Sequence, residues 1–195
     1  MCGIAGYISR QKTGNGKNLV SGMLNTINHR GPDQQGLDTW GNVTLGMARL
    51  SIVDQEVHTI PYMDESKNFS IVYNGEIYNH DRIRKGLSSS CRFKTGSDAE
   101  TALYSFIEKG IDSFGEHNGM YAFAIHDQLR NETYIVRDKV GEKPVYYTCG
   151  KDFFAFSSEM KALLQVVEPQ FNEDAVSYDA YEFTVGKETL FKNIY

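Results

Sequence analysis

Short runs of β-branched and aromatic residues dominate the chain and predict strands bounded by turn residues. Residues 120–125 are apolar at every position, which is typical of a strand covered on both faces. The polar residues 127–132 predict a hairpin loop between two long strands. Residues 3–8 have the character of a buried strand with close backbone approach at its glycines. The other predicted strands cover residues 43–48, 69–73, 120–126, 133–136, 145–149 and 153–156.

Helical spacing of apolar residues is clearest from Ala99 to Ile107. Ser97 and Glu100 predict a capping box at the start of this helix, and Gly110 predicts its end. Weaker helical patterns cover residues 20–27, 159–166 and 173–183. Successive hairpins with helices inserted around them favour antiparallel sheets with helices on their outer faces.

Composition narrows the class of protein. The chain has 195 residues, enough for one domain or a domain with an appendage. Its 25 acidic and 20 basic residues give a net charge of −5, and no basic stripe indicates nucleic-acid binding. No apolar run approaches the roughly 20 residues of a membrane span, and no signal-peptide pattern opens the chain. Cys2, Cys91 and Cys149 are spaced neither as a disulfide framework nor as metal ligands. We therefore expect a soluble cytoplasmic protein without a metal site.

Cys2 follows the initiator methionine directly and is the most informative position in the chain. Removal of Met1 would give one residue both a thiol and a free α-amine, which is a nucleophile with its own base. The reference pKa values are about 8.5 for a thiol and about 7.7–8.0 for an α-amine, so the amine can accept the thiol proton near neutral pH. Cys2 could instead be a small apolar residue buried in the first strand.

Amide hydrolysis by a thiol also needs hydrogen-bond donors for the tetrahedral oxyanion. Asn74 offers a side-chain NH₂ group and Gly75 an unobstructed backbone N–H. An α-amino-acid substrate needs its head group held, and Arg49 suits a carboxylate while Asp98 suits an ammonium. Structure alone could explain each of these residues. Asn-Gly is a strong hairpin-turn signal, Asp98 suits the first turn of a helix, and Arg49 could be a surface cation.

Eight motifs occur in order through most of the chain, and together they identify a family resemblance. The chain resembles the glutaminase domain of class II, N-terminal-nucleophile, glutamine amidotransferases, and within them the asparagine-synthetase branch. The motifs are MCGIAG at 1–6, HRGPD at 29–33, RLSIVD at 49–54, YNGEIYN at 73–79, TGSD at 95–98, GMYAFA at 119–124, Arg137-Asp138 with Gly141, Lys143, Pro144 and Tyr146, and SSEMKAL at 157–163.

The resemblance implies an α+β fold of the Ntn-hydrolase type, a four-layer α/β/β/α sandwich of two antiparallel sheets. It implies that Cys2 attacks the side-chain amide of L-glutamine and forms a γ-glutamyl thioester, while Asn74 and Gly75 form the oxyanion hole. Arg49 and Asp98 would hold the amino-acid head of glutamine. By the same resemblance Leu50, Ile52, Val53 and Glu76 complete the glutamine site, and Arg30 and Met120 lie toward the ammonia exit.

The resemblance also divides the chain. Residues 2–165 correspond to the glutaminase domain, and residues 166–195 resemble the linker to a synthetase domain. The Ser-Gly-Gly-x-Asp-Ser loop that binds ATP in that domain does not occur in this sequence. We therefore expect no cofactor here, with ATP and Mg²⁺ bound by a synthetase domain or a separate synthetase chain. Residues 58–61, His-Thr-Ile-Pro, depart from the family's Gly-x-Gln-Pro pattern.

Several alternatives stay open at this level. The chain could be a fragment or a free-standing glutaminase, and it could form a homo-oligomer. The acceptor of the ammonia is not specified by these residues. A non-catalytic glutamine-binding or scaffold module is the alternative function, and retention of Met1 would leave an inactive precursor.

Overall fold

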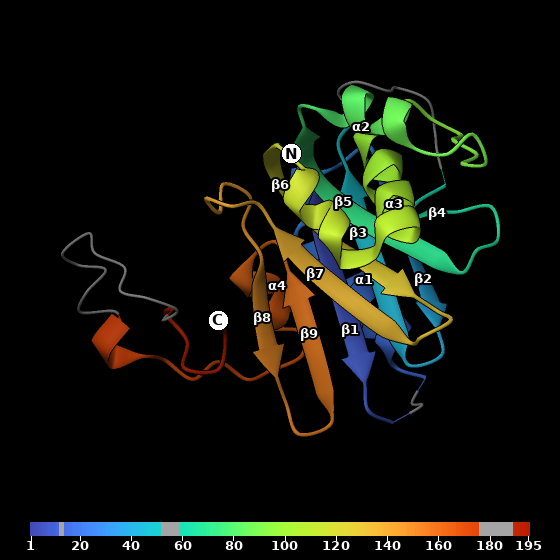
Figure 1. Cartoon of the computed structure of the whole chain (residues 1–195). Coiled ribbons are helices and arrows are strands. Elements are labelled where there is room, and N and C mark those ends of the chain that lie inside the picture. Colours follow the sequence, from blue (N-terminus) through green and yellow to red (C-terminus); the bar gives the residue numbers. More distant parts are fainter. Residues whose placement is uncertain (12–13, 52–58, 176–188) are drawn as a thin grey trace.

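Two antiparallel sheets form the centre of the computed structural model, which describes residues 1–11, 14–51, 59–175 and 189–195 (Figure 1). The five-stranded sheet has the order β2-β3-β1-β9-β8, and the four-stranded sheet has the order β4-β5-β6-β7. Strands of the first sheet are β1 (Gly3–Ser9), β2 (Gln34–Trp40), β3 (Val43–Arg49), β8 (Tyr146–Cys149) and β9 (Phe153–Ser157). Those of the second are β4 (Tyr62–Met63), β5 (Phe69–Ile77), β6 (Gly119–Asp127) and β7 (Glu132–Arg137).

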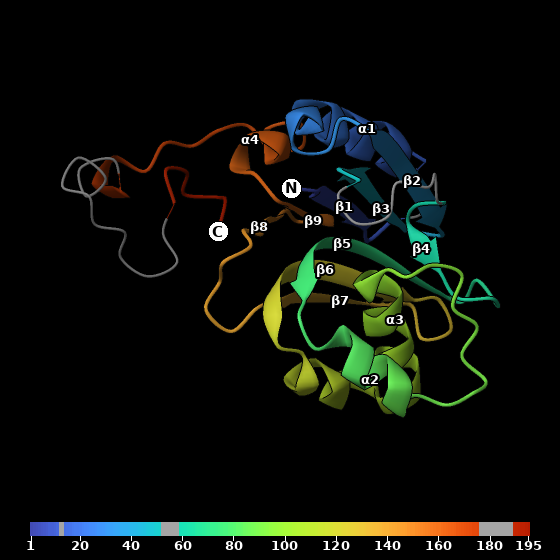
Figure 2. The same cartoon turned by 90° about the horizontal axis from the view of Figure 1, so that it is seen from above.

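Helices cover the outer face of each sheet, as Figure 2 shows from above. Helices α1 (Gly16–Thr26) and α4 (Met160–Leu163) pack on the five-stranded sheet. Helix α3 (Asp98–Lys109) packs on β5 and β4, with α2 (His80–Gly86) against it. Two 3₁₀ helices, Asn28–Arg30 and Gly110–Glu116, follow α1 and α3. The layers run helix, sheet, sheet, helix, which confirms the predicted α/β/β/α sandwich.

The main core lies between the sheets and continues under α3. Ile4, Leu45 and Phe156 reach it from the five-stranded sheet, and Val72 and Ala122 from the other. Every side chain from Tyr121 to Ile125 is buried, as predicted for a strand covered on both faces. The β6–β7 hairpin also forms, with residues 128–131 as its loop.

The structure excludes one local alternative and corrects one local prediction. Asn74 and Gly75 do not form a hairpin turn, because they lie inside β5 opposite Ala122 and Tyr121 of β6. The capping box forms only in part. Ser97 Oγ caps α3 by accepting from the Ala99 N–H, but the Glu100 carboxylate accepts backbone N–H groups of residues 94 and 95 instead of returning to Ser97.

Other differences concern polar or short elements. Strands β2 and β4 and helix α2 were not predicted, because β2 is mostly polar at the sheet edge and β4 has only two residues. The helix predicted at 159–166 is shorter and spans Met160–Leu163. Most of the helix predicted at 173–183 lies outside the described residues. Among the described residues, no helix is long and apolar enough to cross a membrane.

His117 is a buried histidine in an aromatic surrounding. Its Nε2 lies 3.1 Å from Ser105 Oγ, and its ring contacts Phe114, Tyr121 and Phe123. Burial lowers the pKa of His117 from 6.5 to about 4. Below pH 6.5 the unfolded chain therefore binds a proton at this histidine, whereas the folded chain binds it only near pH 4. The free energy of unfolding consequently decreases as the pH is lowered.

We expect the protonation of His117 on unfolding to make the free energy of unfolding about 2 kcal/mol lower at pH 5 than at pH 7. The measurement is urea unfolding at both pH values for the wild-type chain and for His117→Gln, which keeps a partner for Ser105. The lowered pKa of the buried His126 acts in the same direction, so the comparison between the two chains isolates His117. An equal loss of stability in both chains would contradict the assignment.

Candidate active site

Cys2 lies just before β1, at the end of the five-stranded sheet. The pairing of Gly3 with Ala48 brings Cys2 next to the end of β3. Cys2 Sγ accepts from the Leu50 N–H at 3.5 Å and lies 3.9 Å from the Leu50 carbonyl oxygen. The side chain is half-buried and packs against the main core. Cys2 is therefore not a residue inside the first strand, and its thiol is held by backbone at a partly open position.

The residues at and just after the end of β3 lie beside this thiol. Arg49 ends β3 and is 6% exposed, and Leu50 is half-buried against Cys2. The next residue is also anchored, because the Ser51 N–H donates to Asp33 Oδ2 at 2.8 Å. This contact explains why the HRGPD and RLSIVD motifs occur together. The predicted site residues Ile52 and Val53 lie outside the described residues.

Asn74 contributes a buried donor from β5. Its side chain is 1% exposed, and Nδ2 has no hydrogen-bond partner among the described residues. The Tyr73 hydroxyl bonds to α3, so strand alternation turns Asn74 to the other face of the sheet, toward β1. A buried N–H without a partner is costly in a folded protein, by about 1–3 kcal/mol. An oxyanion donor must likewise keep its N–H unpaired before substrate binds.

Gly75 allows a close approach of two backbones. A Cβ atom at this position would lie 2.2 Å from the Met120 carbonyl oxygen, so no side chain fits. The opposite residue, Tyr121, directs its N–H and its carbonyl to Asp138, at 3.2 and 2.8 Å. In an antiparallel ladder, a residue whose N–H and carbonyl both point to one neighbouring strand forms a non-hydrogen-bonded pair with the residue opposite it on the other neighbour. Gly75 and Tyr121 are such a pair, so the Gly75 N–H points away from β6. The Gly75 N–H is therefore available to a ligand.

Asp98 is the first residue of α3 and is fixed by two donors. Its Oδ2 accepts from the Tyr73 hydroxyl at 2.5 Å and from the Ile77 N–H at 2.7 Å. Burial raises the pKa of Tyr73, and the neighbouring Asp98 carboxylate raises it further, which keeps this phenol neutral and donating. These bonds hold the Asp98 carboxylate in one orientation at the edge of the sheet, beyond the end of the short strand β4.

Tyr62 is a further residue associated with these groups, and sequence reasoning missed it. Burial is the main cause of the raised pKa of Tyr62; Arg49 and a hydrogen bond with Ser97 lower it, and Cys2 and Asp98 raise it. Cys2, Arg49 and Asp98 therefore all act electrostatically on the Tyr62 hydroxyl. Its position one residue after the departing residues 58–61 is the only sequence signal that could have indicated it.

The comparisons with known proteins agree with this geometry. A family model described as the glutamine amidotransferase domain matches residues 1–195. The chain belongs to the glutamine amidotransferase family. Its relatives include a glutamine-hydrolysing asparagine synthetase 3 of Bacillus subtilis (strain 168), 38% identical over 170 residues, and a putative asparagine synthetase 2 of Methanocaldococcus jannaschii, 34% identical over 223 residues. The matches cover 84% and 100% of this chain but only 27% and 42% of the relatives.

Solved structures show the same fold at lower sequence identity. One is the glutamine phosphoribosylpyrophosphate amidotransferase of B. subtilis, with a TM-score of 0.69, 18% identity, and coverage of 83% of this chain and 43% of that one. Another is described as the allosteric regulatory enzyme of purine biosynthesis, with a TM-score of 0.72, 19% identity, and coverage of 85% and 43%. The Ntn-hydrolase fold expected for an amidotransferase domain is thereby confirmed.

Three further predicted residues of this amidotransferase domain surround the same region. Arg30 donates from Nε to the Cys2 carbonyl oxygen at 3.0 Å. Glu76 is exposed near the end of β5, and the half-buried Met120 lies opposite it on β6. Cys2 thus contacts both Arg30 and Leu50, whereas no contact joins Glu76 to Cys2 among the described residues. The roles assigned to all these residues stay predictions.

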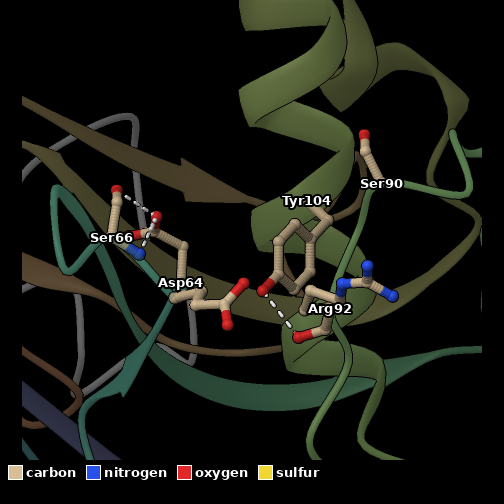
Figure 3. A pocket seen from close by; sticks show the side chains of 6 residues that line it. Asp64, Ser66, Ser90, Arg92 and Tyr104 are labelled. Carbon is tan, nitrogen blue, oxygen red and sulfur yellow. Dashed lines mark hydrogen bonds between the residues drawn. The ribbon is translucent and has the colours of Figure 1, made fainter.

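A separate cavity of about 310 Å³ lies between the β4–β5 turn and the loop before α3 (Figure 3). It contains none of the predicted site residues. Its polar groups bond within the fold: the Asp64 carboxylate accepts from Ser66, and the Tyr104 hydroxyl donates to the Arg92 carbonyl at 2.7 Å. In the part of the chain that the structure describes, no group of acidic, histidine or cysteine side chains could hold a metal ion.

Proposed function

We propose that this domain hydrolyses L-glutamine to glutamate and ammonia through a γ-glutamyl thioester on Cys2. The observation that carries the proposal is the buried, unpaired Nδ2 of Asn74 on the strand facing β1. The Gly75 N–H, which is not directed at Tyr121 of the opposite strand β6, would supply a second donor on the same strand. Membership of the amidotransferase family supports glutamine as the substrate.

The reaction begins after Met1 has been removed. Cys2 Sγ attacks the side-chain carbonyl carbon of glutamine, and the thiol proton moves to the Cys2 α-amine. The carbonyl oxygen becomes an oxyanion that Asn74 Nδ2 and the Gly75 N–H stabilise. The α-ammonium then returns the proton to the leaving nitrogen, so that ammonia departs and the thioester remains. Water adds to the thioester by the same route and releases glutamate and the thiol.

Recognition of the amino-acid head follows from two fixed charges. The Arg49 guanidinium can pair with the α-carboxylate in a two-pronged geometry. Asp98, already oriented by Tyr73 and Ile77, offers Oδ1 to the α-ammonium. The Tyr62 hydroxyl, on which both Arg49 and Asp98 act electrostatically, would be a further hydrogen-bonding group for the amino-acid head. Backbone around Leu50, together with Ile52, Val53 and Glu76, would complete the pocket.

The ammonia would serve an amide-forming synthetase of the asparagine-synthetase type, on this chain's continuation or on a partner chain. The chain spans 27% and 42% of two of its relatives, which are asparagine synthetases. ATP and Mg²⁺ would bind that synthetase, and Arg30 and Met120 would lie on the path of the ammonia. Residues 166–195 would connect the glutaminase domain, residues 2–165, to the synthetase. Within them, Ile194 is buried, and Tyr195 exchanges backbone hydrogen bonds with Tyr147 of β8.

Hydroxylamine trapping tests the thioester directly. Hydroxylamine competes with water for a thioester and would convert it to γ-glutamyl hydroxamate. We expect purified chain without Met1 to release ammonia from glutamine, and hydroxylamine to divert part of the product to hydroxamate. Intact mass first establishes that Met1 is absent. Glutamine binding by calorimetry without ammonia or hydroxamate would overturn the proposal and favour a non-catalytic binding module.

A further inference from the structure

Residues 157–159, at the end of β9, anchor the start of the chain. The Ile4 N–H donates to Ser158 Oγ at 2.9 Å, and the Ser158 N–H donates to the Ile4 carbonyl at 2.9 Å. Ser157 Oγ donates to the same carbonyl at 3.2 Å. All these groups are buried. The first residue fixed by this segment is Ile4, so Cys2 needs a different attachment.

Arg30 provides this attachment for Cys2. Its Nε donates to the Cys2 carbonyl at 3.0 Å, and its Nη1 lies 3.1 Å from Glu159 Oε1. The Arg30 side chain is 9% exposed, so this ion pair is shielded from water. Glu159 directly follows the two serines that hold Ile4. One short segment thus holds both Ile4 and, through Arg30, the main chain of Cys2.

Glu159 also contacts a histidine and a lysine. His29 Nε2 lies 2.9 Å from Oε1, and Lys161 Nζ lies 3.1 Å from Oε2. Burial raises the pKa of Glu159, but the bonds from Arg30, Lys161 and His29 outweigh it and the pKa is lowered. The carboxylate is therefore ionised at neutral pH and keeps Arg30 in place.

We propose that Glu159 is a positioning residue for the nucleophile, acting through the Arg30 guanidinium on the Cys2 carbonyl. The inference rests on the proposed function of Cys2. Once Met1 is gone, Cys2 is the chain terminus, and a terminal residue frays unless it is tied down. Its ties are the Arg30 bond at the carbonyl and the Leu50 contact at Sγ. Glu159 restricts where Arg30 can point, and so sets the direction of the thiol and the α-amine toward glutamine.

This role predicts an effect on turnover rather than on glutamine binding. Glu159→Leu should lower kcat about 10-fold, because a small misplacement of a reacting group is costly. KM for glutamine should change less than about twofold, because Arg49 and Asp98 are untouched. Glu159→Gln should recover most of kcat, since its Oε1 still accepts from Arg30. Lys161→Gln is the matched control, because Lys161 contacts Glu159 without touching Arg30, and it should retain full activity.

The route through Arg30 is tested by a double-mutant cycle. In an Arg30→Met background, Glu159→Leu should reduce kcat no further, since the two residues act as one unit. Additive losses would overturn the inference, and so would wild-type kcat in Glu159→Leu. Equal defects in the Leu and Gln variants, accompanied by a lowered Tm, would also overturn it and indicate a structural role. Inactivity of the wild-type chain would instead be a failure of the proposed function.

Discussion

Cys2→Ala is expected to reduce ammonia release from glutamine by at least about 10⁴-fold, the scale of loss when a covalent nucleophile is removed. The remaining groups cannot substitute, because a free α-amine at residue 2 has no thiol to activate. Glutamine binding should persist within a few-fold, since Arg49 and Asp98, the proposed head-group residues, are unchanged. Coupled measurement of ammonia and calorimetry of glutamine binding would establish both parts.

The matched controls are the other two free cysteines. Cys91 is half-buried and Cys149 is exposed, and neither contacts Cys2, Leu50 or β5 in the hydrogen bonds of the described residues. Cys91→Ala and Cys149→Ala should retain wild-type turnover. Wild-type turnover in Cys2→Ala, with Met1 removed from the parent chain, would rule out the thioester mechanism. Loss of turnover in Cys149→Ala as well would show that the effect of replacing a cysteine is not specific to Cys2.

The central strands were predictable because their signals are local and consistent with their surroundings. Residues 120–125 are apolar at every position, and a strand between two layers buries those from Tyr121 to Ile125. Helix α3 likewise has its apolar stripe and its Ser97 cap in one stretch of sequence. Local propensity and tertiary packing agree at these elements, so sequence alone located them.

Local sequence signals were misleading at Asn74 and Gly75 of the candidate site. Asn74-Gly75 has the sequence of a hairpin turn, yet the pair lies in the middle of β5. The asparagine there leaves its amide unpaired, and the glycine allows the backbone of Met120 to approach. A conflict between local propensity and structure is expected at functional positions.

Long-range contacts account for the rest of what sequence could not show. Arg30 and Glu159 are separated by 129 positions, and Cys2 and Leu50 by 48. A single sequence contains no signal for such pairings. The family resemblance indicated that these motifs belong together but did not say which atoms meet. Tyr62 belongs to no motif, and only the electrostatic influence of Cys2, Arg49 and Asp98 on its hydroxyl indicates it.

Asn74→Ala is expected to lower kcat by about 10²–10³-fold, the loss typical of removing one oxyanion donor. Its amide bonds the oxygen only when charge develops there, so KM for glutamine should change much less than kcat. The folded state should not lose stability from the missing bond, because Nδ2 has no partner among the described residues. Steady-state kinetics and urea unfolding of the same preparation measure both quantities.

Asn74→Asp is the informative companion, because it keeps the size of the side chain and replaces the donor with a carboxylate. A carboxylate facing the developing oxyanion would repel it, so kcat should fall at least as far as in Asn74→Ala. A rise in KM with unchanged kcat in both variants would place Asn74 in ground-state binding instead. The Gly75 N–H would then be the remaining candidate donor, and its position on β5 depends on the absence of a side chain beside Met120.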